Sequence, residues 1–166
     1  MNIQSMLTLY DYSYWATRRI LAASARLSPA EFAEPAAPGL ASLRDTLVHA
    51  LDGECAWRTL YQQQTLAAFG ALTAAAFPSV ASLTERWQAE EQTMRAYLAQ
   101  LSDADLTAAI RYTTAEGDRR ERLLWHCLIH VVNHGTQHRS EAAVMLTALG
   151  ASPGALDFTA FLNEQP

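Results

Sequence analysis

The stretch of sequence that decides both the fold and the site is His126-Cys-Leu-Ile-His130-Val-Val-Asn-His134-Gly-Thr-Gln-His138-Arg139. Its histidines recur at every fourth residue, and mostly apolar side chains separate the first three of them. Residues four apart are neighbours on one face of an α-helix, with Cβ atoms about 5–6 Å apart. The pattern therefore predicts one long amphipathic helix over residues 122–149, which ends before Gly150.

Three upstream segments show the same helical spacing of apolar residues, and we expect them at residues 4–26, 42–64 and 78–101. Ser28-Pro29 is interpreted as the end of the first segment, because proline disfavours a helical conformation in the residue before it. Ser42 is a suitable N-cap for the second segment. Four amphipathic helices with little strand pattern predict an all-α protein with the architecture of a four-helix bundle.

The connections between the predicted helices add to this picture. Residues 65–78 form a linker that would span roughly 46 Å if extended at about 3.3 Å per residue. The second helix would be roughly 33 Å long at about 1.5 Å per residue. The linker is therefore long enough to return along the bundle and to make the second and third helices parallel. Residues 102–120 are polar with a strand-like stretch at Ile110–Thr114, and residues 151–166 form a tail with one short apolar turn.

Length and composition indicate a globular protein. The chain has 166 residues, half of them hydrophobic, and a net charge of −5, so we expect a single domain over residues 1–166. All twelve basic residues are arginines, and the short cluster Arg119, Arg120 and Arg122 is interpreted as a solvated helix end. An acidic chain without a long basic stripe is a poor candidate for binding nucleic acid.

The sequence also predicts where the protein resides. Its N-terminus lacks the basic region and the long apolar region of a secretory signal. The most apolar loop, residues 65–77, is too short to span a bilayer, so no membrane partner is expected. Cys55 and Cys127 do not resemble a disulfide framework. We therefore expect a soluble cytoplasmic protein.

The histidine ladder also suggests a metal site. Two imidazoles four residues apart on a helix can direct one nitrogen each at an ion, which zinc-type metals bind at about 2.0–2.1 Å. Helix phase places His134 and His138 nearest to the apolar stripe, His130 farther round and His126 nearly opposite. His49 is the one remaining histidine that could supply a third ligand. Spacing alone leaves open a polar, solvated face, and it leaves His130 near the ligands or without a role.

Two other residues attract attention. Glu54 lies in the middle of the apolar face of the second helix, about 140° round from His49, so we do not expect it to bind the same ion. A carboxylate on an apolar face needs a partner, and helix phase suggests Arg139. We therefore predict a buried or interfacial ion pair between Glu54 and Arg139. Cys127 is interpreted as a small buried hydrophobic residue and not as a fourth ligand.

The histidine helix resembles the signature helix of the DinB/YfiT-like family, in the segment His130-Val-Val-Asn-His134-Gly-Thr-Gln-His138-Arg139-Ser. Other parts of the chain resemble further patterns of this family: Tyr12-Ser-Tyr-Trp15-Ala, Leu47-Val-His49-Ala-Leu with Glu54 and Trp57, and Leu149-Gly150 through Asp157-Phe158. The resemblance thus covers nearly the whole chain. One departure is Ser140, where the family often has glycine.

The resemblance implies a four-helix bundle with up-down-down-up topology and a metal ion bound by three histidines. By motif these are His49 from the second helix and His134 and His138 from the fourth, the same pair that helix phase selects. The resemblance also implies a homodimer. Zinc and nickel both suit imidazole ligands, and the sequence does not choose between them.

Three neutral histidines with an open position are typical of a catalytic metal site. Characterised relatives include transferases and isomerases that use low-molecular-weight thiols, so the resemblance implies a thiol-dependent S-transferase acting on a small electrophile. No catalytic side chain can be named from the sequence. Two alternatives stay open. One is a non-catalytic metal-binding or dimerisation module linked to stress or DNA damage, and the other is a metal-dependent hydrolase.

Overall fold

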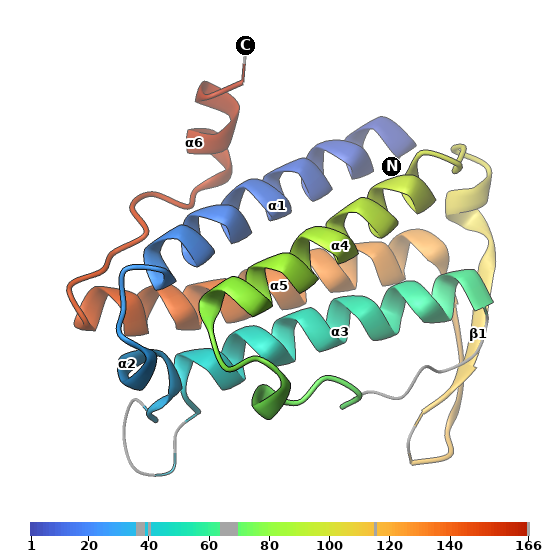
Figure 1. The fold of residues 1–166 in the computed structure, drawn as a ribbon. Helices are drawn as coiled ribbons and strands as arrows, with labels where there is room; N and C mark the ends of the chain where they lie inside the picture. Colours follow the sequence, from blue (N-terminus) through green and yellow to red (C-terminus); the bar gives the residue numbers. More distant parts are fainter. Residues whose placement is uncertain (36–38, 40, 64–69, 115, 166) are drawn as a thin grey trace.

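Four long helices form the body of the protein, as the sequence predicts (Figure 1). The computed structural model describes residues 1–35, 39, 41–63, 70–114 and 116–165. In these residues the long helices are α1 (Ile3–Ser24), α3 (Leu43–Gln63), α4 (Val80–Leu98) and α5 (Leu124–Ala148). The four-helix bundle is confirmed, and the predicted helix ends differ from the observed ones by a few residues.

The helices pack in a ring in which α5 touches α1 and α3, while α4 touches the same two helices from the other side. The pair formed by α3 and α5 therefore lies opposite the pair formed by α1 and α4. Helices α3 and α4 run in the same direction, and α1 and α5 run in the other (Figure 1). Side-chain contacts agree, since Arg58 of α3 reaches Glu90 of α4, and Glu54, one turn earlier, reaches Trp87.

The linker between α3 and α4 falls partly outside the described residues, because residues 64–69 are not among them. Its described part returns alongside α3. The backbone N–H groups of Gly70 and Leu72 donate hydrogen bonds to the carboxylate of Asp52, in the middle of α3, at 2.6 and 2.8 Å. A short 3-10 helix, η1 (Ala74–Ala76), follows before α4 begins. The buried side chain of Phe77 anchors this return in the apolar core.

The described residues also form shorter elements outside the four long helices. These are the helices α2 (Pro29–Ala33) and α6 (Phe158–Asn163), the 3-10 helix η2 (Asp105–Thr107), and the strands β1 (Ala109–Thr113) and β2 (Arg119–Leu123). The strand-like pattern at residues 110–114 corresponds to β1, which pairs with β2 as an antiparallel hairpin. The basic cluster of residues 119–122 lies in β2, so its interpretation as a helix end is wrong. Cross-strand pairing with β1 holds these residues extended up to the start of α5.

Helix ends follow local capping chemistry. Ser42 precedes α3, where its Oγ accepts a hydrogen bond from the Asp45 N–H at 3.0 Å and its own N–H donates to the Asp45 carboxylate at 3.1 Å. This reciprocal pair satisfies two donors at the start of the helix. Ser28 and Glu31 form the same arrangement before α2. Pro29 therefore begins a helix there, a start signal that the sequence analysis interpreted only as an end.

The core consists of two apolar clusters, and the bundle also buries several polar and charged side chains. The predicted ion pair between Glu54 and Arg139 is wrong. Glu54 accepts hydrogen bonds from the Tyr14 hydroxyl and from the Trp87 indole N–H. The Arg139 guanidinium instead donates to the hydroxyls of Ser13 and Thr136, both at 2.9 Å. Each group finds neutral partners on nearer elements, which removes the need for a direct pair.

None of the described helices combines the length and apolar composition needed to cross a membrane.

Candidate metal centre

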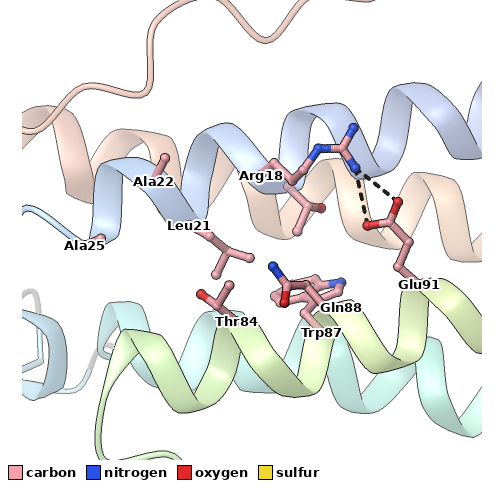
Figure 2. A pocket seen from close by; sticks show the side chains of 9 residues that line it. Arg18, Leu21, Ala22, Ala25, Thr84, Trp87, Gln88 and Glu91 are labelled. Carbon is pink, nitrogen blue, oxygen red and sulfur yellow. Dashed lines mark hydrogen bonds and ion pairs between the residues drawn. The ribbon is translucent and has the colours of Figure 1, made fainter.

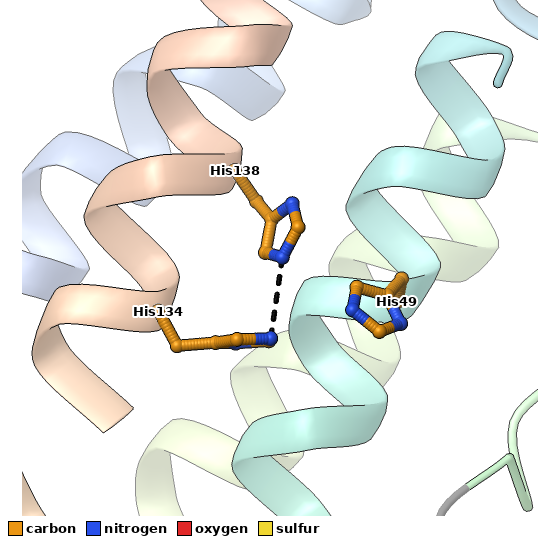
Figure 3. A group of neighbouring side chains, drawn as sticks. All are labelled: His49, His134 and His138. Carbon is orange, nitrogen blue, oxygen red and sulfur yellow. Dashed lines mark hydrogen bonds between the residues drawn. The ribbon is translucent and has the colours of Figure 1, made fainter. Parts of the chain in front are cut away.

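Three histidines converge on the face formed by α3 and α5 (Figure 3). His49 comes from α3, and His134 and His138 come from successive turns of α5. One ring nitrogen of each lies within 4.8 Å of the other two. Among the described residues, this is the one group of three or more potential ligands close enough to hold an ion. The structure thus brings together the three residues that the sequence analysis selected.

The spacing of the two α5 rings fits a metal ion. The Nε2 atoms of His134 and His138 lie 3.2 Å apart. Two nitrogens bound to a tetrahedral zinc ion at 2.0–2.1 Å are separated by about 3.3–3.4 Å. The ring centroid of His49 lies 4.7 Å from that of His138 and 5.2 Å from that of His134. The residues present therefore suit a three-nitrogen site.

Gly53 makes room for this arrangement, and sequence reasoning missed it. It lies on α3 one turn after His49, and a Cβ atom at this position would lie 2.7 Å from Cε1 of the His134 ring. Such a distance is too short for two carbon atoms, so any larger residue would displace the ring. The signal in the sequence is a glycine inside a helix, which costs about 1 kcal/mol relative to alanine and calls for a packing reason.

Glu141 orients His138. Its carboxylate oxygen lies 2.7 Å from Nδ1 of His138, three residues earlier on α5. An imidazole that donates Nδ1–H to a carboxylate presents Nε2 as the free ligand atom, which is the usual way in which proteins fix a metal-binding histidine. The signal for Glu141 in the sequence is its i,i+3 spacing from His138, which by itself does not distinguish it from other acidic residues on a helix surface.

The electrostatic environment of His134 disfavours its protonation. Burial, together with the neighbouring rings of His138 and His49, lowers the pKa of His134 to about 4. A neutral imidazole is the form that binds a metal ion. His49 is exposed, whereas His134 and His138 are half-buried. The centre therefore combines available nitrogen atoms with access from solvent.

The other two histidines of the ladder continue along the same face. The ring of His130 packs against Trp57, with centroids 4.8 Å apart, and lies 6.0 Å from that of His134. His126 is exposed and packs edge-on against its neighbour Trp125. The prediction that His126 lies at the surface is confirmed, and His130 borders the ligands without joining them. Cys127 is buried, as expected.

A separate hollow of about 280 Å³ lies between α1 and α4 (Figure 2). Arg18 and Glu91 at its rim already form an ion pair at 3.0 Å. Leu21 and Trp87 contribute apolar walls. This hollow belongs to the face opposite the histidines and offers no free titratable group among its lining residues, so the candidate site is the α3–α5 face.

Comparison with known proteins agrees with this architecture. The sequence model of the DinB family matches residues 1–166. A DinB-like protein from Bacillus cereus superposes with a TM-score of 0.69 at 17% identity, over 90% of this chain and 93% of that one. YfiT from Bacillus subtilis is described as a probable metal-dependent hydrolase with an unusual four-helix bundle topology. It superposes with a TM-score of 0.66 at 12% identity, over 87% of this chain and 85% of that one. At these identities the likeness shows the fold. No curated protein matches this chain in sequence.

Proposed function

The chain belongs to the DinB family, and from that premise we propose that it is a metal-dependent enzyme whose divalent ion, zinc or nickel, is held by His49, His134 and His138. The observation that carries the proposal is the convergence of three imidazoles on an accessible face, with ligand atoms within 4.8 Å of one another. Three protein ligands leave a further position for a reactant, as in catalytic rather than structural sites.

A divalent ion at this position supplies a Lewis acid that lowers the pKa of water or of a thiol and so provides a nucleophile near neutral pH. The protein contributes the positioning. His134 and His138 are fixed one helical turn apart, Gly53 leaves space for the His134 ring, and Glu141 sets the tautomer of His138.

Neither of the two cysteines of the chain is placed to act as the nucleophile. Cys55 is on the side of α3 that faces α4, where its thiol contacts Glu90 and Arg86. Burial raises the pKa of Cys55, which keeps this thiol protonated. Cys127 is buried, and burial raises its pKa to about 11. Neither cysteine serves the histidine centre.

The function that we favour is therefore transfer to a low-molecular-weight thiol. The thiol sulfur forms a bond to an electrophilic carbon, the leaving group departs with its electron pair, and the thiol proton passes to solvent. The family resemblance supports a thiol in this role. A second candidate is hydrolysis with water as the nucleophile, and the description of YfiT as a probable metal-dependent hydrolase favours it.

The first experiment is metal analysis of untagged protein. We expect one zinc or nickel ion per wild-type chain and a loss of most of it in His49→Ala, His134→Ala and His138→Ala. His126→Ala is the matched control, because it removes an exposed histidine from the same helix and should retain the ion. Equal metal content in all five proteins would refute the proposed centre.

The second experiment separates the reactions. Metal-loaded protein is assayed with 1-chloro-2,4-dinitrobenzene and a series of cellular thiols, and in parallel with 4-nitrophenyl acetate alone. Turnover that needs both thiol and metal supports the transferase. Ester hydrolysis without thiol supports the hydrolase. If His134→Ala lowers the unfolding temperature while no substrate is turned over, the ion has a structural role and the enzyme proposal is wrong.

A further inference from the structure

A hollow of about 290 Å³ continues the α3–α5 face beyond the three histidines. Its lining residues come from α3, both strands of the hairpin and α5: Trp57, Tyr112, Arg122, His126, Cys127 and His130. His130 lies between the hollow and the three histidines. Its ring borders the hollow, and its ring centroid lies 6.0 Å from that of His134. Residues four apart on a helix are about 6 Å apart along its axis. A small molecule in the hollow is therefore within reach of the metal centre.

The register of the hairpin explains how Tyr112 and Arg122 reach this place. Ile110 pairs with Arg122, and Tyr112 pairs with Arg120. Directly opposed residues share one face of a sheet, and successive residues alternate between faces. Ile110 is 5% exposed, so this face packs on the bundle. Tyr112 and Arg122 are consequently directed at the α5 helix.

The opposite face of the same hairpin has a different character. There Arg111 and Glu121 are directly opposed and form an ion pair at 2.6 Å. Both side chains are more than half exposed. On this face the two charges pair with each other in solvent. On the face that borders the hollow, Arg122 has no such ion-pair partner among the described residues.

The hollow has aromatic walls and one cationic group. The Trp57 ring lies 5.6 Å from Tyr112 and 4.8 Å from His130, centroid to centroid. Arg122 donates one hydrogen bond, to the carbonyl of Glu121 at 2.7 Å, and forms no ion pair with any described residue. None of the six lining residues is acidic, in a chain whose net charge is −5. A guanidinium has five N–H donors, and two of them match the geometry of a carboxylate.

We infer that this hollow binds a planar organic carboxylate, with its flat part against Trp57 and Tyr112 and its carboxylate on Arg122. The inference rests on the proposed function, because it assigns the hollow to the substrate that reacts at the adjacent metal centre. It also gives a role to the half of the histidine ladder that does not bind the ion: His126 and His130 supply additional N–H donors along the wall.

The test measures binding of 2-naphthoate and its neutral analogue 2-naphthamide to the metal-loaded protein by titration calorimetry. We expect naphthoate to bind more tightly than naphthamide, and Arg122→Gln to weaken naphthoate by about tenfold, the equivalent of one charge-assisted hydrogen bond. Naphthamide affinity should not change in this variant. Arg111→Gln is the matched control, because it removes the same charge from the other face of the hairpin and should bind both probes as the wild type does.

Three outcomes would overturn the inference. One is no naphthoate binding at millimolar concentration, and another is equal affinity for both probes. The third is naphthoate binding that Arg122→Gln leaves intact and His134→Ala abolishes, because the carboxylate would then sit on the ion. Metal content is measured on the same samples. Arg122-dependent binding to a protein that holds no metal would refute the proposed function while supporting the carboxylate hollow.

Discussion

Helix α3 carries polar residues on two sides, and the two sides differ in how their polar atoms are satisfied. Towards α4 and α1, Glu54 accepts hydrogen bonds from Tyr14 and Trp87 in the interior. Towards α5, His49 is exposed and faces two half-buried histidines. Both sides put polar groups into a helical bundle, where an unsatisfied polar atom is costly.

The α4 side is closed by its own partners. Glu90, which is fully buried, accepts hydrogen bonds from Arg58 and Arg86 and from the thiol of Cys55. Both oxygens of this carboxylate therefore accept a hydrogen bond from a donor within the chain. A network of this kind stabilises and aligns helices, and it leaves no atom for a ligand.

The α5 side is left open. Among the described residues outside the three histidines, Glu141 is the one side chain that hydrogen-bonds to one of these rings, and it engages the nitrogen that does not face the other two histidines. The Nε2 atoms of His134 and His138 lie 3.2 Å apart and share no other partner in the described part of the chain, so they need an ion or a proton between them. The two sides of α3 thus differ less in polarity or burial than in whether their polar atoms have hydrogen-bond partners within the described chain.

Glu90→Ala is the most severe test of this difference. The substitution leaves Arg58 and Arg86 facing a cavity without a counter-charge, and breaking a buried pair in this way costs about 3–5 kcal/mol. We expect urea unfolding to show a loss of unfolding free energy near the lower end of this range, because the Arg86 side chain is one-third exposed and can be partly solvated. Glu91→Ala, next to it on α4, is the control, since its partners Arg18 and Arg95 are 56% and 40% exposed and can be solvated without it. Metal content should not change in either variant. A cost below 1 kcal/mol would show that the α4 side is not the structural one.

The pH dependence of stability tests the role of Glu54, which lies on the side of α3 that faces α4 and α1. Burial raises the pKa of Glu54 from 4.5 to about 7, so the folded chain binds a proton here that the unfolded chain has lost. Stability contributed by this proton is complete below pH 4.5 and is lost as the pH rises to 7. Relative to Glu54→Gln, which cannot titrate, the wild type should lose up to about 3 kcal/mol across this window. Urea unfolding of both proteins at pH 5 and pH 8, with chelator present, measures the difference. Parallel pH dependence in the two proteins would contradict the assignment.

Much of this fold is visible in the sequence, because a helical period of apolar residues is a local signal. The four long helices and the cap at Ser42 follow from it. So does the pair His134 and His138, since their spacing and phase belong to one helix. His49 was harder, because nothing local says that α3 lies beside α5. His49 is predicted only as the remaining histidine and through the family pattern.

The features that the sequence does not predict depend on contacts between different helices and strands. Helix phase showed that Glu54 faces inwards, but it could not show that α1 and α4 supply neutral donors, so Arg139 was wrongly chosen as the partner. The sequence does not predict that Arg122 lies in a strand, because a five-residue strand leaves little pattern to detect. Its place beside the aromatic hollow follows only from the hairpin register.

Gly53→Ala sharpens the comparison on the open side. The added methyl would lie 2.7 Å from Cε1 of His134, so the ring must rotate away from the position in which Nε2 faces His138. We expect metal affinity to fall about 10–100-fold, the range seen when the support of a ligand is disturbed. Alanine favours a helix by about 1 kcal/mol over glycine, so the metal-free variant should not be less stable through its backbone. Competition with a chromophoric chelator measures affinity, and urea unfolding in chelator measures stability. Unchanged affinity would show that the ring position does not depend on this glycine.

Glu141→Gln is the mildest test, because it keeps an acceptor for His138 Nδ1 and removes only the charge. The carboxylate lies 2.7 Å from Nδ1, but its side chain is 44% exposed, so solvent screens much of its effect. We expect metal affinity to fall by about tenfold or less, with no change in unfolding free energy of the metal-free protein. Gln137→Ala removes the other side-chain partner of Glu141 and should leave affinity unchanged. If Glu141→Gln lowers stability as much as affinity, then Glu141 belongs with Glu90 among the structural carboxylates, and the division of polar groups between the two sides of the bundle fails at this residue.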